Sequence, residues 1–128
     1  ILKMNKEPIV FALSNPDPEV EPEEIFDIAS VVATGRSDFP NQINNVLAFP
    51  GIFRGALDCH SREINTEMCL AAAKALSQAV SEEALSAENI VPSIFQEGVS
   101  HIVADAVKVA AKSTKVARVY DTEIDWLD

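Results

Sequence analysis

The chain has 128 residues, 48% of them hydrophobic and 23% charged, and its 20 acidic against 10 basic side chains give a net charge of −10. This length and composition are typical of one globular domain with a buried core. The negative charge disfavours a nucleic-acid partner, because phosphates would be repelled, and no apolar run approaches the ~20 residues that cross a membrane.

The two cysteines and the first residues of the chain bear on its cellular compartment. Cys59 and Cys69 are too few for a disulfide scaffold, and their spacing matches no zinc motif. We interpret them as free thiols of a reducing compartment. The residues from Ile1 to Met4 have neither the basic nor the apolar segment of a signal peptide. These features predict a cytoplasmic protein.

Two short apolar segments early in the chain have the character of strands. Residues 9–13 are a continuous apolar run that ends at a proline-containing turn, which predicts a strand buried on both faces. Residues 31–34 are a second such run. Between them, Pro22 and the acidic residues around it predict a short helix over 22–29. Strand, helix and strand form a βαβ unit, so we expect parallel pairing and a right-handed crossover.

Three helical segments are expected in the remainder of the chain. Asn44 and Asn45 can cap a helix that reaches about residue 57, with a kink or a break into two helices at its internal Pro-Gly pair. Thr66 is a good N-cap for a helix over 67–80. Apolar side chains at helical spacing predict a last helix over 97–112. Its expected buried residues are Val99, Ile102, Val103, Ala106, Val107 and Ala110.

The order of these elements predicts an α/β fold. We expect a partial Rossmann-like parallel sheet, of the three-layer αβα kind, with C-terminal helices, and a single domain over residues 1–128. Two parallel strands are a poor folding unit by themselves, so further strands are expected upstream or from another chain. Residues 116–128 are expected to dock on a surface through their apolar side chains. These are Val119, Tyr120, Ile124, Trp126 and Leu127.

Polar residues follow each predicted strand at the place where open parallel sheets bind ligands, beyond the carboxyl ends of the strands. Ser14 and Asn15 follow the first strand, and Gly35 follows the second. Asn45 opens the next helix, whose first N–H groups are free to bind an anion. A neutral carboxamide can hold a carboxylate or an amide without setting a proton. We therefore expect Asn15 and Asn45 to converge on one crevice.

Structural alternatives exist for these residues. Asn15 has the character of an ordinary turn residue, and Asn44 or Asn45 that of an ordinary helix cap. Arg36 can bind a phosphate or carboxylate, or it can bridge to Asp38 or to an acid of a neighbouring helix. No glycine-rich dinucleotide turn, phosphate loop, nucleophile elbow or metal-ligand spacing is present in the sequence. The residues alone support a ligand crevice and name neither a catalytic residue nor a metal ligand.

Two stretches carry a family resemblance. Residues 10–16, VFALSNP, resemble the FALSNP signature of malic enzymes. Residues 33–57, ATGRSDFPNQINNVLAFPGIFRGAL, are similar to a long block of the bacterial and archaeal members of that family. The similarity continues into the last helix, to about Ala111. A match of this length is highly specific.

The resemblance implies an activity and roles for four residues. Malic enzymes oxidatively decarboxylate malate to pyruvate and CO2, reduce NAD or NADP, and use Mg²⁺ or Mn²⁺. In the family, the Asn of the SNP turn and the second Asn of the NN pair contact the substrate and the nicotinamide end of the cofactor. These correspond to Asn15 and Asn45 here, and Ser14 and Gly35 are expected to contact the cofactor as well.

The family's other functional groups find no match in this chain. The tyrosine acid, the lysine base, the metal-binding carboxylates and the glycine-rich turn lie upstream in malic enzymes. The resemblance therefore implies the C-terminal portion of an NAD(P)-binding domain, without the N-terminal catalytic domain and the glycine-rich half. We expect it to be inactive alone, to act with that missing part on malate and pyruvate, and to belong to a homo-oligomer.

Two readings from other classes stay open, and so do some details. The chain is alternatively a non-catalytic acidic α/β interaction module, or a fragment of another dinucleotide-dependent dehydrogenase. The choice between NAD and NADP is undecided. The residues that recognise the ribose normally lie ~20 residues beyond the glycine-rich turn, and this chain has no such turn. The oligomeric state is equally open.

Overall fold

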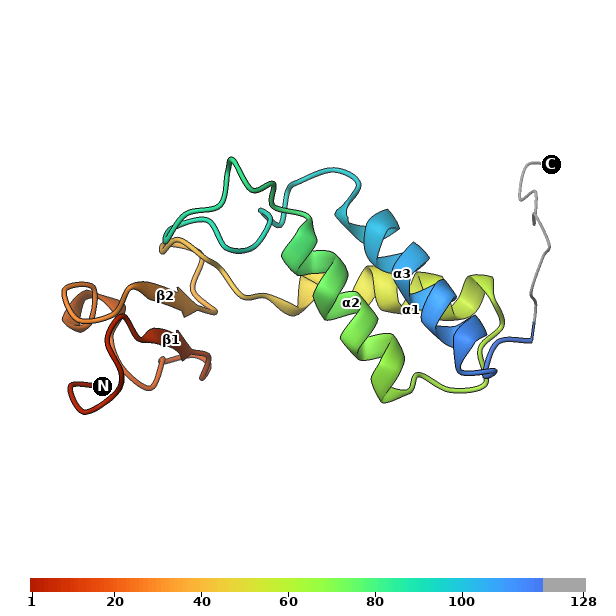
Figure 1. Ribbon diagram of the computed structural model, residues 1–128, viewed down its shortest axis with the longest axis horizontal. Helices are drawn as coiled ribbons and strands as arrows, with labels where there is room; N and C mark the ends of the chain where they lie inside the picture. Colours follow the sequence, from red (N-terminus) through yellow and green to blue (C-terminus); the bar gives the residue numbers. More distant parts are fainter. Residues whose placement is uncertain (119–128) are drawn as a thin grey trace.

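A computed structural model describes residues 1–118. The expected docking of the C-terminal tail through Val119, Tyr120, Ile124, Trp126 and Leu127 lies outside the described residues. The described chain has two ends (Figure 1): a small sheet near the N-terminus, and a group of helices beyond it. Residues 35–44 lead from the sheet to the helices, and residues 79–98, which connect two helices, loop back toward the sheet.

The sheet consists of two parallel strands, β1 (Ile9–Ala12) and β2 (Val31–Thr34). Their register pairs Ile9 with Val31 and Ala12 with Thr34. Both strands and their parallel pairing confirm the prediction. The helix expected over 22–29 is wrong in extent: it is the three-residue 3₁₀ helix η1 (Pro22–Glu24), followed by turns. A segment this short gains too few hydrogen bonds to propagate an α-helix.

The expected burial of β1 on both faces is also wrong for the described chain. The side chains of Ile9 and Phe11 are 60% and 50% exposed, whereas Ala33 in β2 is fully buried. A sheet of two strands has too few neighbouring elements to cover both faces of an edge strand. The sheet end therefore presents apolar surface that its own residues do not cover.

The helical end begins with two elements. The 3₁₀ helix η2 (Asn45–Leu47) is followed by α1 (Phe49–Asp58), so the alternative of two helices is confirmed, but the break falls at Ala48. Pro50 lies in the first turn of α1. A backbone N–H at this position has no acceptor within the helix, so the lack of an N–H in proline costs no hydrogen bond. The proline therefore starts the second helix instead of interrupting a longer one.

Helices α2 (Thr66–Gln78) and α3 (Val99–Ser113) complete the described fold. Both were predicted, with ends that differ by one or two residues. The N-cap of α2 is Asn65 and not Thr66, because the Asn65 side chain accepts the N–H of Met68 at 3.0 Å. Gly98, with a φ of 83°, sets the start of α3. A left-handed residue cannot continue a helix toward the N-terminus, and glycine adopts this conformation without strain.

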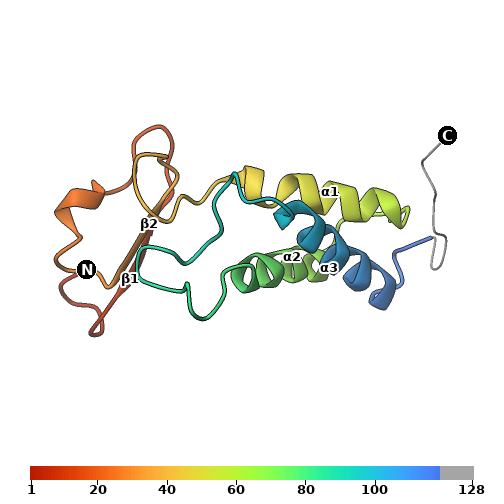
Figure 2. The ribbon, with the colours of Figure 1, turned by 90° about the horizontal axis from the view of Figure 1, so that it is seen from above.

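The core lies among the helices. Helix α3 packs against both α1 and α2, as Figure 2 shows, and Val103 and Val107 are completely buried. Ile102, expected in this core, is 47% exposed. Two glycines of α1 permit close approach to α3. A Cβ at Gly51 would lie 2.5 Å from the Cβ of Val103, and one at Gly55 would collide with the carbonyl oxygen of Ala104.

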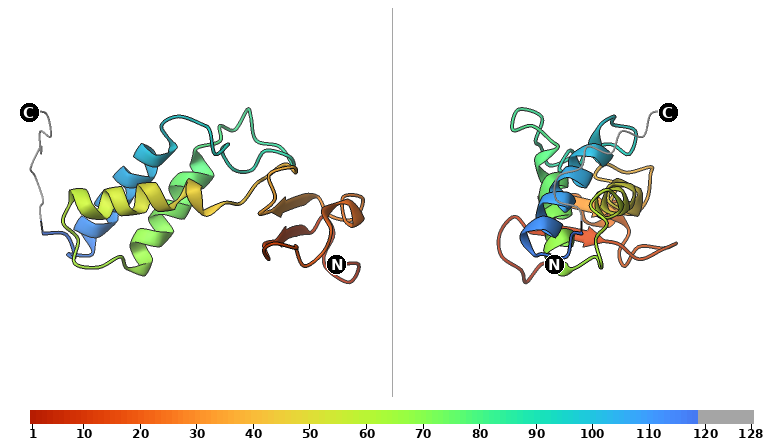
Figure 3. Two further views of the ribbon diagram at one scale, coloured as in Figure 1. Left: turned by 180° about the vertical axis from the view of Figure 1, so that it is seen from behind. Right: turned by 90° about the vertical axis from the view of Figure 1, so that its right-hand side faces the viewer.

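The architecture confirms an α/β fold with a parallel sheet and C-terminal helices. Figure 3 shows the helices beyond the end of the sheet, with the arrows of both strands pointing toward them. Within residues 1–118, no helix is long and apolar enough to cross a membrane. The carboxyl ends of the strands thus face η2 and the start of α1, where the site residues were expected.

Candidate functional site

The turn after β1 is fixed by short-range hydrogen bonds. The backbone N–H of Ser14 donates to Oε2 of Glu19 at 3.1 Å, and this bond lowers the pKa of the Glu19 carboxyl. The Asn15 Nδ2 lies 3.5 Å from the carbonyl oxygen of Leu13, at the limit of a hydrogen bond. Ser14 and Asn15 are both exposed. The Asn15 carboxamide thus retains donor and acceptor capacity for a ligand.

Gly35, at the end of β2, is in direct contact with this turn. A Cβ atom on Gly35 would lie 3.1 Å from Oδ1 and 3.5 Å from Nδ2 of Asn15. The Asn15 carboxamide therefore occupies the space that a side chain at position 35 would need. The structure brings Ser14, Asn15 and Gly35 together at the carboxyl ends of the two strands, as the sequence predicted.

Arg36, the next residue, is held by protein carboxylates. Its Nε and Nη2 donate to the two oxygens of Asp38 at 3.0 and 2.6 Å, and its Nη1 donates to Glu21 at 3.0 Å. The guanidinium carbon lies 4.7 Å from the ring centroid of Phe39. The bond from Arg36 lowers the pKa of Asp38, and Asp38 in turn raises the pKa of Arg36. The structural alternative for Arg36, a bridge to nearby acids, is confirmed.

The segment that leads to Asn45 runs beside β2. Gln42 pairs with Thr34 in an isolated parallel bridge, and the N–H of Ile43 donates to the carbonyl of Thr34 at 2.8 Å. Asn44 caps η2, since its Oδ1 accepts the N–H of Val46 at 3.0 Å. Asn45 is the first residue of η2 and is exposed. The cap role therefore belongs to Asn44, which leaves the Asn45 carboxamide available.

Asn15 and Asn45 thus both come after the carboxyl ends of strands, on different segments. Both follow strands whose carboxyl ends point toward η2 (Figure 1). Among the described residues, no hydrogen bond joins the two side chains. Their convergence on one ligand stays a prediction, and the structure supports it through the bonds that tie Ile43 to the end of β2.

Sequence reasoning missed Asn41. The Asn41 side chain is buried and makes three hydrogen bonds, to Val32, Ala87 and Ile90. Asn41 has a φ of 55°, a conformation that Asn adopts more readily than most residues do. The presence of an asparagine is therefore the one sequence signal that could have indicated a special backbone position here. Its partners are distant in sequence, so the pattern alone could not identify them.

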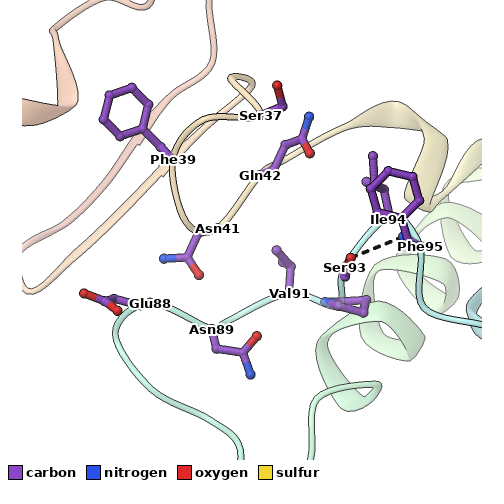
Figure 4. Close-up of a pocket in the computed structure, with 11 residues that line it drawn as sticks. Ser37, Phe39, Asn41, Gln42, Glu88, Asn89, Val91, Ser93, Ile94 and Phe95 are labelled. Atoms are coloured by element: carbon purple, nitrogen blue, oxygen red, sulfur yellow. Dashed lines mark hydrogen bonds between the residues drawn. The ribbon is translucent and has the colours of Figure 1, made fainter.

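A pocket of about 280 Å³ lies beside Asn41 (Figure 4). Side chains from residues 37–42 line one side of it, and side chains from residues 88–95 line the other. The Asn41 carboxamide points across toward the second segment. The pocket therefore lies between the segment that follows β2 and the loop that connects α2 to α3.

The described residues do not form a metal centre. Residues 1–118 contain no group of three or more His, Cys, Asp or Glu side chains close enough to hold an ion. Cys59 is buried, Cys69 is exposed, and both are free thiols. This part of the chain can orient a ligand through carboxamides and backbone groups, and we assign it no metal chemistry.

A family model described as "Malic enzyme, NAD binding domain" matches residues 1–117. The chain belongs to the malic enzyme family. It is 58% identical to an NAD-dependent malic enzyme of Geobacillus stearothermophilus over 118 residues, which are 92% of this chain and 25% of that protein. It is 55% identical to a bifunctional malic/malolactic enzyme of Bacillus subtilis, covering 93% of this chain and 29% of that protein.

Solved structures of malic enzymes share the fold. The malic enzyme of Pyrococcus horikoshii superposes with a TM-score of 0.87 at 51% identity, over 94% of this chain and 28% of that one. The Entamoeba histolytica malic enzyme superposes with a TM-score of 0.89 at 41% identity, over 93% and 25%. The chain thus spans about a quarter of the length of the malic enzymes that it matches.

Proposed function

We propose that this chain is the C-terminal portion of the NAD(P)-binding domain of a malic enzyme. The complete enzyme would convert malate to pyruvate and CO2 while reducing NAD or NADP. The observation that carries this proposal is the family match over residues 1–117. The contact between the Asn15 carboxamide and Gly35, at the carboxyl ends of β1 and β2, is consistent with a ligand site in this part of the domain.

The structural basis for cofactor binding is the absence of a Cβ at position 35. Glycine there leaves room for the Asn15 carboxamide beside the backbone, where a ligand can approach closely. A bound dinucleotide would supply the hydride acceptor. We propose that Ser14, Asn15, Gly35 and Asn45 contact its nicotinamide end.

Asn15 and Asn45 are also the proposed substrate-binding residues. Each carboxamide has two N–H donors and one acceptor oxygen and carries no charge. It can therefore orient a malate carboxylate and hydroxyl without changing their protonation. Holding the substrate and the nicotinamide in one geometry lowers the entropic part of the barrier. No described residue is proposed as the catalytic acid or base.

The other components of the reaction are proposed to lie elsewhere in the enzyme. We propose that a missing N-terminal part supplies the acid, the base and the glycine-rich turn, and holds Mg²⁺ or Mn²⁺. Following the family resemblance, the complete protein would be a homo-oligomer of the cytoplasm. Its ligands would be malate, pyruvate and the dinucleotide, without nucleic-acid or membrane partners.

The direct test is a product assay of the full-length protein that contains this chain. With malate, a divalent cation and either NAD or NADP, we expect reduced nucleotide, pyruvate and CO2 in equal amounts. Residues 1–128 alone, as the matched control, are expected to give no malate-dependent rise in reduced nucleotide. Conversion of malate without nucleotide reduction, or no conversion at all by the full-length protein, would contradict the proposal.

A further inference from the structure

Asn41 is a buried side chain whose three hydrogen bonds all go to main-chain groups. It is 6% exposed. Its Nδ2 donates to the carbonyl of Val32 at 2.9 Å and to the carbonyl of Ala87 at 2.7 Å. Its Oδ1 accepts the N–H of Ile90 at 2.9 Å. Two donors and one acceptor are used, which only a carboxamide of this length can provide here.

These bonds join segments that are far apart in the sequence. Val32 belongs to β2, whereas Ala87 and Ile90 belong to the connection between α2 and α3. Figure 4 shows the Asn41 carboxamide between the two facing segments. Asn41 therefore links the end of the sheet to the loop that leads back from the helices.

The backbone of Asn41 adds a second set of constraints. Its carbonyl accepts the N–H of Thr34 at 3.4 Å, and two residues later the N–H of Ile43 donates to Thr34 at 2.8 Å. The segment fixed in this way leads directly to Asn45. Gly35, against which Asn15 packs, is the residue after Thr34. Asn41 is thus connected to both halves of the candidate site without being part of it.

We infer that Asn41 is a positioning residue for the malate and nicotinamide site. By bonding β2 and the 87–90 loop at once, it fixes the segment from which Asn45 emerges, relative to the strand end that carries Gly35. This inference rests on the proposed function. A shift of ~1 Å in a positioned group can cost up to ~100-fold in rate, so loss of these bonds should be visible in kinetics.

The test uses Asn41→Gly in the full-length enzyme. Glycine accepts the φ of 55° without strain, and the substitution removes the buried side chain together with its three hydrogen bonds. We expect the KM for malate to rise about tenfold with a smaller change in kcat, because binding geometry is lost and the chemical groups are intact. Hydrogen exchange should accelerate at the amides of Ile90 and Ile43, which report the side-chain bond and the positioned segment.

Asn65→Ala is the matched control. Asn65 also makes two side-chain hydrogen bonds, to Met68 at 3.0 Å and Thr114 at 2.9 Å, but at the far end of the helices. It should lower thermal stability and leave the KM for malate unchanged. Unchanged KM in Asn41→Gly, or an equal rise in Asn65→Ala, would overturn the inference.

The exchange measurement separates this inference from the proposed function. If the wild-type enzyme does not oxidise malate, the proposed function fails, and the positioning of Asn45 for malate fails with it. If the wild type is active but the Ile43 amide exchanges equally in Asn41→Gly, only the positioning role is overturned. Activity with faster exchange at Ile43 and a raised KM supports both.

Discussion

The two ends of the molecule differ in how fully they bury their apolar residues. At the helical end, Val103, Val107 and Met68 are completely buried between α1, α2 and α3. At the sheet end, Ile9 and Phe11 of β1 and Leu13 in the turn after it are 60%, 50% and 42% exposed, although Ala12 is buried. Ser14, Asn15 and Gly35 of the candidate site lie at the second of these ends, and Asn45 lies in η2, where the helical end begins.

This difference separates the source of stability from the source of function. Three helices can cover one another, because α3 fits between α1 and α2. Two strands cannot cover both their faces, and a sheet of this size is marginal by itself. We therefore expect the helices to stabilise the chain, and the rest of the malic enzyme to complete the sheet around the site. Substitutions at the two ends should have different effects.

The largest expected effect on stability is at the helical end. In Gly55→Ala, the new Cβ would collide with the carbonyl oxygen of Ala104 and contact Val107, so α1 and α3 must separate. Overpacking of this kind costs about 1–3 kcal/mol. Urea unfolding of the full-length protein, followed by circular dichroism, measures the loss.

The same substitution at the sheet end is the control that sharpens the comparison. In Gly35→Ala, the three atoms nearest the new Cβ all belong to the end of the Asn15 side chain, which can rotate away. We expect the free energy of unfolding to change by less than ~1 kcal/mol, within the range of ordinary surface substitutions. Equal losses in the two variants would contradict the contrast between the ends.

Gly35→Ala should instead weaken ligand binding. Displacement of the Asn15 carboxamide would remove a hydrogen bond to the nicotinamide end of the cofactor, which is worth about 0.5–1.5 kcal/mol. Calorimetric titration of the full-length enzyme with NAD and with NADP measures the change. Wild-type affinity in Gly35→Ala would show that the contact with Asn15 has no part in binding.

The smallest expected effect concerns Asp38 and acid. Because its bond to Arg36 lowers the pKa of Asp38 below the ordinary 3.8, the pair contributes stability above about that pH. The contribution is lost as the pH falls through the lowered value. NMR titration of the Asp38 carboxyl carbon should show a lower pKa in the wild type than in Arg36→Gln. Identical titration curves would mean that the bond does not form in solution.

Much of the fold could be predicted because its signals are local. The apolar runs of the two strands are short and end at turn residues, so β1 and β2 were found at nearly the right bounds. The spacing of Val99, Val103 and Val107 identified the buried side of α3. Secondary-structure propensity and hydrophobic periodicity depend on residues close together in the chain, so they can be recognised from the sequence.

The errors in the predicted fold arise where contacts between residues far apart in the sequence determine the structure. The exposure of β1 depends on how many strands flank it, and the sequence of a strand does not contain that number. Asn65, which caps α2 in place of Thr66, also bonds Thr114, a residue 49 positions away that its local sequence does not reveal. Asn41 is a similar case, because its bonds to Ala87 and Ile90 join residues 46 and 49 positions apart.

The prediction of the candidate site has two parts, the positions of its residues and their roles in binding, and the structure supports the first more than the second. The contact of Asn15 with Gly35 follows from parallel strands that end side by side, and the structure shows it. The roles of Asn15 and Asn45 in binding came from the family resemblance. Physical chemistry shows that carboxamides suit such a place, but the ligand they bind must be identified by experiment.

The most direct test of this account is the kinetics of Asn45→Ala in the full-length enzyme. Because Asn44 and not Asn45 caps η2, the substitution should leave the fold unchanged. A lost hydrogen bond to a charged ligand costs about 1.5–3 kcal/mol, so the KM for malate should rise by roughly 10- to 100-fold, with a lower kcat. Steady-state constants equal to those of the wild type would contradict the proposed site.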